Sequence, residues 1–72
     1  MREPYPMPGF VAEALESRRL RAKYDARPPY QRNDYVGWIT LARRMETKLR
    51  RLQKMLDELE AGDRYLKMKW GS

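Results

Sequence analysis

The chain has 72 residues, and its 16 Lys and Arg against 10 Asp and Glu give a formal net charge of +6. This length suits one domain, whose single core usually leaves only about 3 to 5 kcal/mol of net stability. Cysteine and histidine are both absent, which excludes disulfides, thiolate metal sites and the Ser-His-Asp and Cys-His arrangements of most hydrolases. We therefore expect a protein that is not an enzyme, needs no metal or cofactor, and favours acidic partners such as nucleic acid or anionic membrane.

The N-terminal segment, residues 1–8, contains prolines at positions 4, 6 and 8. Proline lacks an amide donor and keeps the residue before it out of the helical region, so we expect an extended arm. No apolar run approaches the roughly 20 residues of a membrane span, and no signal-peptide pattern is present. Together with the absence of cysteine, this predicts a cytoplasmic protein without a membrane span.

Two short helices are expected next. Four apolar residues share one helical face and predict a helix over residues 9–17: Phe10, Val11, Ala14 and Leu15. Leu20 and Tyr24 lie one turn apart and predict a second helix over residues 18–26. Pro28-Pro29 must end it, because the residue before each proline is driven out of the helical conformation.

The region after Tyr30 contains no proline, and its apolar residues recur at alternating steps of 3 and 4: Tyr35, Trp38, Ala42, Met45, Leu49, Leu52, Leu56 and Leu59. A repeat of this length is typical of one long helix that pairs as a coiled coil. Two helices that meet near residues 44–46 would show the same repeat, and no local residue forces a break there. Periodicity leaves both interpretations open, whereas Gly62 predicts where the last helix ends.

The tail, residues 63–72, alternates Leu66, Met68 and Trp70 with lysines, which is strand periodicity. We expect an extended aromatic and basic tail in which Tyr65 or Trp70 folds back onto the helices. An acidic cluster lies around the preceding helix end, at Asp57, Glu58, Glu60 and Asp63. It lacks the spacing of a calcium loop, and we expect a solvated face on which Lys54 pairs with Glu58, and Glu60 with Arg64.

The candidate binding segment lies between residues 43 and 54, where six cations are offset only by Glu46: Arg43, Arg44, Lys48, Arg50, Arg51 and Lys54. On a helix, Arg44, Lys48 and Arg51 would share one face. Such a stripe could follow the phosphates of a nucleic acid. The alternative is a solvated helix surface whose other side packs in the core.

The aromatic residues before this segment also have two interpretations. An exposed Trp38 could stack on a base or on a ring of a peptide. Because it lies on the apolar face, core packing is favoured, with an arginine over the indole. The residues expected to form the core at this corner are Tyr35, Trp38, Ile39, Leu49 and Leu52.

A further set of residues follows a recognisable order within about residues 7–62: Pro8, Ala14-Leu15, Pro29, Arg32, Tyr35, Trp38-Ile39, Ala42-Arg43, Thr47-Lys48, Arg51-Leu52, Met55-Leu56 and Gly62. This order resembles the bacteriocin-protection, YdeI/OmpD-associated family of small bacterial domains. That family's pattern runs from a proline and a helix ending in Ala-Leu, through "P..R..Y..WI..AK...TR..R", to a leucine-bearing helix closed by glycine.

Three positions depart from the family pattern. Arg43 replaces a lysine, and Lys48 replaces an arginine and lacks its rigid guanidinium fork. Met45 replaces a proline, a residue that fits the first turn of a helix and not its interior. The resemblance therefore favours two helices with a turn near residues 44–46 over one rod.

We thus expect an all-α fold, a small bundle of three to four short helices between extended arms. The helical domain should span residues 9–62, with helices at roughly 9–17, 18–26, 30–44 and 46–60. The resemblance implies a non-catalytic interaction module in bacteriocin, antimicrobial-peptide or envelope-stress tolerance, as a monomer or weak homodimer with an unidentified protein partner. A nucleic-acid-binding basic domain is the alternative. Five residues could contact an anion or a partner: Arg43, Arg44, Thr47, Lys48 and Arg51. Alternatively they tie two helices together, which is the interpretation that we favour.

Overall fold

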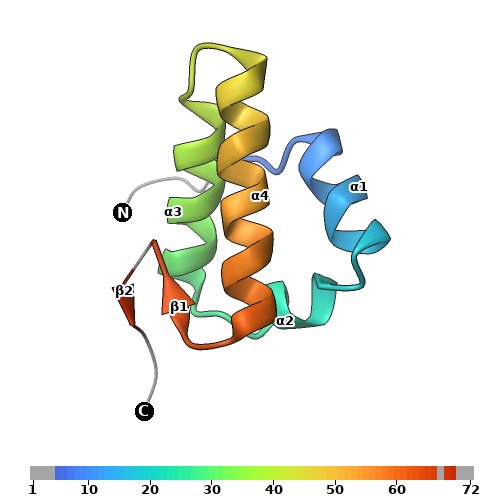
Figure 1. The fold of residues 1–72 in the computed structure, drawn as a ribbon, viewed down its shortest axis with the longest axis vertical. Coiled ribbons are helices and arrows are strands. Elements are labelled where there is room, and N and C mark those ends of the chain that lie inside the picture. Colours follow the sequence, from blue (N-terminus) through green and yellow to red (C-terminus); the bar gives the residue numbers. More distant parts are fainter. Residues whose placement is uncertain (1–4, 67, 70–72) are drawn as a thin grey trace.

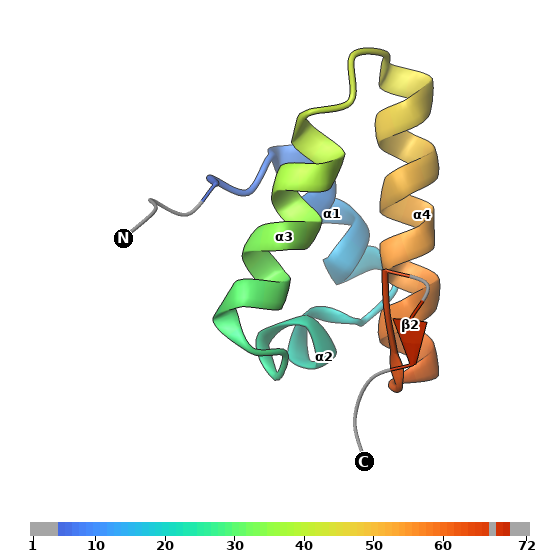
Figure 2. The ribbon, with the colours of Figure 1, turned by 90° about the vertical axis from the view of Figure 1, so that its left-hand side faces the viewer.

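The computed structural model describes residues 5–66, 68 and 69. In this part of the chain the elements are α1 (Gly9–Ser17), α2 (Arg21–Asp25), α3 (Pro29–Thr40), α4 (Met45–Ala61), β1 (Arg64–Tyr65) and β2 (Met68–Lys69). α3 and α4 lie side by side and antiparallel, with α1 and α2 on one side of this pair and the two strands on the other (Figures 1 and 2). The predicted all-α bundle is confirmed.

Prolines set where two of the helices begin. The extended backbone of Pro8 precedes α1, and its carbonyl accepts hydrogen bonds from the amides of Val11 and Ala12 at 3.1 and 3.2 Å. Pro29 is the first residue of α3, where its missing amide costs nothing. The helix expected over residues 18–26 is shorter, because Arg19 takes the left-handed conformation (φ 57°) and ends the preceding turn.

The chain reverses between Thr40 and Met45, so the single coiled-coil rod is wrong. Met45 begins α4, in agreement with the proline that the family pattern has at this position. The turn covers residues 41–44, earlier than the expected 44–46, and α3 is correspondingly shorter than the predicted helix 30–44. α4 ends at Ala61, and Gly62 caps it with a φ of 87°, the left-handed conformation that glycine adopts without strain.

The core lies between α1, α3 and α4 and draws on every helix. Its buried residues are Val11, Leu15, Leu20, Tyr24, Tyr35, Val36, Ile39, Leu52, Met55, Leu56, Leu59 and Tyr65. The expected core positions Tyr35, Ile39 and Leu52 are among them. Burying each side chain of this size stabilises the fold by roughly 1.5 to 3 kcal/mol.

Two expected core residues are not fully buried. Leu49 is 49% exposed, so its assignment to the core is wrong. Its 17-residue helix α4 is about 25 Å long whereas the 9-residue α1 is about 14 Å long, and the first turns of α4 extend beyond α1 (Figure 1). Trp38 is partly buried and packs against the edge of the core.

The N-terminal arm is extended at residues 5–8, as predicted, and it packs on α3. The Tyr5 amide donates a hydrogen bond of 2.6 Å to Asn33 Oδ1. Its ring lies so close to Gly37 that a Cβ there would be 2.5 Å from Tyr5 Cε2. Glycine in the middle of α3 therefore makes room for the arm; residues 1–4 of the expected arm lie outside the described residues.

The C-terminal tail forms a short antiparallel hairpin in place of one extended segment, with Arg64 opposite Lys69 and Tyr65 opposite Met68. Leu66 has a positive φ of 49°, which allows the chain to turn back. The Tyr65 ring meets the Tyr35 ring edge-on at 5.5 Å between centroids. The predicted return of Tyr65 to the helices is confirmed, and Trp70 lies outside the described residues.

Candidate functional site

The C-terminal end of α3 is held by cations from α4. The last carbonyls of a helix have no partner within the helix. Here Lys48 Nζ donates to the Thr40 carbonyl at 2.5 Å, and Arg51 Nη1 donates to the Trp38 carbonyl at 2.6 Å. Positive charge is also favourable at this end of the helix dipole. These two members of the predicted contact set therefore tie α3 to α4.

Arg51 has a second contact with the same residue. Its guanidinium carbon lies 5.3 Å from the centroid of the Trp38 ring, within the range of a cation–π interaction. The arginine therefore contacts both the backbone and the indole of Trp38.

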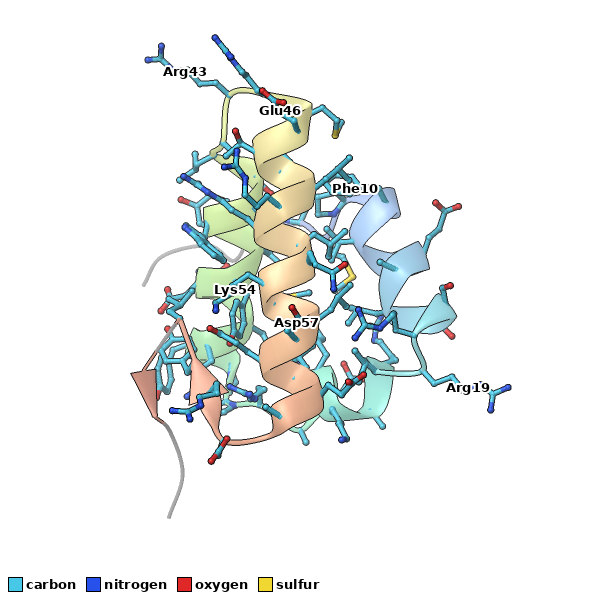
Figure 3. The ribbon with its side chains drawn as sticks, in the orientation of Figure 1. Phe10, Arg19, Arg43, Glu46, Lys54 and Asp57 are labelled. Atoms are coloured by element: carbon cyan, nitrogen blue, oxygen red, sulfur yellow. The ribbon has the colours of Figure 1, made fainter. Side chains whose placement is uncertain are left out.

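A groove of about 550 Å³ opens beside this pair, between the end of α3 and the exposed side of α4. Its lining residues are Trp38, Thr47, Arg50, Arg51, Gln53, Lys54 and Asp57. The indole supplies an apolar surface, and Arg50, Arg51 and Lys54 outnumber the one carboxylate, Asp57. We call this site the Trp38 groove; Lys54 and Asp57 mark its lower part in Figure 3.

The predicted contact residues do not all meet in this groove. Thr47 lines it, and its hydroxyl accepts a hydrogen bond of 3.5 Å from Arg50 Nη2. Arg43 and Arg44 are exposed in the turn before α4, where Arg43 points away from the bundle (Figure 3) and Arg44 lies 3.7 Å from Glu46. The structure therefore places Thr47 and Arg51 at the Trp38 groove, Lys48 against the end of α3, and Arg43 and Arg44 together as a separate exposed pair.

A buried polar network links the helices beneath the hairpin. Glu58 Oε1 accepts hydrogen bonds from the Tyr35 hydroxyl at 2.5 Å and from the Leu66 amide at 2.6 Å. Arg27 donates to Gln31 Oε1 at 3.0 Å and to the Glu58 carbonyl at 3.2 Å. Burial raises the pKa of the Tyr35 hydroxyl well above its usual range, and the hydrogen bond to Glu58 raises that pKa further. The network is enclosed, and its contacts join α3, α4 and the hairpin.

The charge pattern predicted a solvated face at Glu58, so the network was not expected; that prediction is wrong, because Glu58 is 3% exposed. The hairpin covers this residue, and nothing in the local charge pattern predicts that cover. One signal was available, since Glu58 lies three residues after Met55, on the face that is buried. In the same acidic cluster, Glu60 pairs with Arg18 at 3.0 Å.

In the described part of the chain, no cluster of three or more acidic side chains is placed to hold a metal ion. Over the same residues, no helix has both the length and the apolar character that crossing a membrane requires.

Comparison with known proteins identifies one family. No curated protein and no solved structure matches the chain. A match over residues 4–62 is found to OmdA, described as bacteriocin-protection, YdeI or OmpD-associated. This range contains the helices α1 to α4, the turn between α3 and α4, and the Trp38 groove. The chain therefore belongs to the bacteriocin-protection, YdeI or OmpD-associated family.

Proposed function

We propose that this chain is a non-catalytic interaction module that binds an acidic segment of a protein partner in the Trp38 groove. One observation carries the proposal: an indole surface and three cations line one open groove. An apolar surface beside positive charge suits a peptide with both apolar and acidic side chains. Trp and Arg are also the residues that most often dominate the binding energy of protein interfaces.

The chemistry of the groove supports a non-catalytic role. Asp57 is its one carboxylate, and Gln53 Nε2 donates to that carboxylate at 2.9 Å. The buried Tyr35–Glu58 pair does not line the groove. Reproducible turnover by the purified chain that disappears in Asp57→Asn would contradict this part of the proposal.

A protein partner is favoured over nucleic acid because of how the cations are used. Lys48 and Arg51 are the centre of the predicted phosphate-binding stripe, and both donate to carbonyls of α3. A continuous row of free cations for a phosphate backbone is therefore interrupted at these two positions.

The groove can be tested with a short peptide of alternating Glu and Leu, and with its Gln–Leu counterpart. In a Trp70→Phe background, Trp38 fluorescence should respond to the acidic peptide and much less to the neutral one. Arg50→Gln combined with Lys54→Gln should weaken binding at least tenfold, because two of the three cations of the groove are lost.

The matched control removes the same charge elsewhere, with Arg19→Asn combined with Lys23→Gln on the other side of the molecule. Equal weakening by both double variants would mean that net charge, not the groove, attracts the peptide. Tighter binding of DNA or RNA than of the acidic peptide at physiological salt would favour the nucleic-acid alternative.

The process we propose is tolerance of bacteriocins, against which the family's description names protection, or of other antimicrobial peptides. Cells that lack the gene should be more sensitive to such peptides than cells that carry it. The Arg50→Gln/Lys54→Gln variant should fail to restore tolerance although it folds. Full restoration by this variant would separate the process from the groove.

A further inference from the structure

The turn between α3 and α4 forms one end of the molecule. It projects beyond α1 and α2 in both ribbon views (Figures 1 and 2). Two of its apolar side chains are among the most exposed in the described chain: Leu41 is 67% exposed and Met45 is 56% exposed. We call Leu41, Arg43, Arg44 and Met45 the α3–α4 tip.

Positive charge accompanies these apolar groups. Arg43 is exposed and points away from the helices (Figure 3). The side chain of Arg44 is 81% exposed, and its contact with Glu46 spans 3.7 Å between two solvated groups, so it leaves most of the cation's charge available. These two arginines belong to a chain whose net charge is +6. The tip therefore combines apolar and cationic side chains on a projecting surface.

The alternatives explain this combination less well. A nucleic-acid backbone attracts the cations but gains nothing from exposed Leu41 and Met45. A second copy of the chain would bring two sets of cations together, and these few side chains bury far less than the roughly 1,200 Å² of a stable interface. A projecting tip also does not enclose a peptide as a groove does.

We propose that the α3–α4 tip docks on the surface of an anionic lipid bilayer. Leu41 and Met45 enter the boundary between headgroups and acyl chains, while Arg43 and Arg44 stay among the lipid phosphates. Two apolar side chains and two arginines give reversible binding that weakens as salt screens the charges. The tip shares no residue with the Trp38 groove, so this docking is independent of the proposed function.

Co-sedimentation of the full chain with lipid vesicles tests the proposal. Vesicles that contain about one third phosphatidylglycerol should bind the chain, and pure phosphatidylcholine vesicles should bind it at least tenfold more weakly, because each arginine near an anionic surface adds favourable energy. Leu41→Ser combined with Met45→Ser should reduce binding at least fivefold. Both side chains are exposed, so circular dichroism and thermal unfolding should stay unchanged.

Arg43→Asn and Arg19→Asn form the matched pair, because each removes one charge from an exposed arginine that points away from the bundle (Figure 3). The first should weaken binding to anionic vesicles and the second should have a clearly smaller effect. Equal effects, no change in the Leu41/Met45 variant, or no binding to anionic vesicles at low salt would each overturn the proposal. The groove variant Arg50→Gln/Lys54→Gln should lose no more binding than the two-charge control Arg19→Asn/Lys23→Gln.

Discussion

At the scale of single residues, the contact between Tyr35 and Glu58 connects the helices to the C-terminal hairpin. Glu58 Oε1 receives one hydrogen bond from α3 and one from the Leu66 amide. A buried carboxylate is costly unless its oxygens are satisfied, so each donor stabilises the position of the other. This residue pair explains why the tail packs against the helices.

Tyr35→Phe should destabilise the protein by about 1 to 3 kcal/mol, because it leaves a buried charged acceptor with one donor fewer. Urea unfolding followed by circular dichroism would measure the loss. Tyr5→Phe is the control, since the hydrogen bond of Tyr5 to Asn33 comes from its amide and survives the change, so the loss should be less than about 0.5 kcal/mol. Equal losses in the two variants would show that the bond to Glu58 adds nothing.

Gly37→Ala should release the N-terminal arm and leave α3 intact. The added methyl group would be 2.5 Å from Tyr5 Cε2, so the Tyr5 ring must move away. Alanine favours a helix by about 1 kcal/mol over glycine, which preserves α3. Amide exchange by NMR should show that the Tyr5 amide loses the protection of its bond to Asn33. Unchanged protection of this amide would contradict the expectation.

At the scale of elements, the join between α3 and α4 depends on cations that reach across the turn. Lys48 and Arg51 come from the first two turns of α4 and bind carbonyls at the end of α3. Two neighbouring carbonyls, of Gly37 and Ile39, already accept amides of the turn. The helix end is thus satisfied partly by its own turn and partly by the next helix.

Lys48→Met keeps the aliphatic stem and removes the donor to Thr40. It should cost about 1 kcal/mol, because the bond is only partly buried. Lys54→Met, which also removes one positive charge from α4, should cost less. The difference in the urea midpoint measures the capping contribution, and a smaller loss in Lys48→Met than in Lys54→Met would refute it.

At the scale of the whole molecule, both ends of the described chain pack against α3. Tyr5 lies on Gly37, and Tyr65 lies against Tyr35. A chain of this size without disulfides has a small core, and these aromatic residues extend it. The packing of both ends against α3 therefore contributes to the stability of the fold.

This packing predicts a loss of stability in alkali. Burial raises the pKa of Tyr35 and of Tyr65 above the usual value of 10. Hydrogen bonds raise it further, to Glu58 for Tyr35 and to Asp34 for Tyr65. The unfolded chain then releases phenolic protons at lower pH than the folded chain, so the stabilisation is complete below about pH 10 and falls as pH rises further.

Urea unfolding at about pH 8 to 11 should therefore show a decline that begins near pH 10. The decline should be smaller in the double variant Tyr35→Phe/Tyr65→Phe, because two of the phenols with a raised pKa are absent from it. A decline of the same size in this variant would assign the effect to other groups.

Much of the fold and part of the site follow from the chain's local properties. Proline fixes its own φ, and glycine adopts the left-handed conformation, whatever residues surround them. Helices accordingly begin just after Pro8 and at Pro29, and α4 ends just before Gly62. The apolar spacing identifies Tyr35 and Leu52 as core residues because helical period and burial are linked. Thr47 and Arg51 were also expected at the α3–α4 join, and both line the groove there.

Long-range packing sets the remaining features, because residues with similar local preferences acquire different partners. Leu49 continues the same apolar repeat as Leu52, yet Leu49 is 49% exposed whereas Leu52 is 6% exposed. Glu58 resembles its acidic neighbours, yet the hairpin buries it against Tyr35. Lys48 has the same charge as its neighbouring cations, yet it donates a hydrogen bond to the Thr40 carbonyl at the end of α3. Helical period and charge are properties of one segment, whereas cover by another segment depends on the length and position of that second segment.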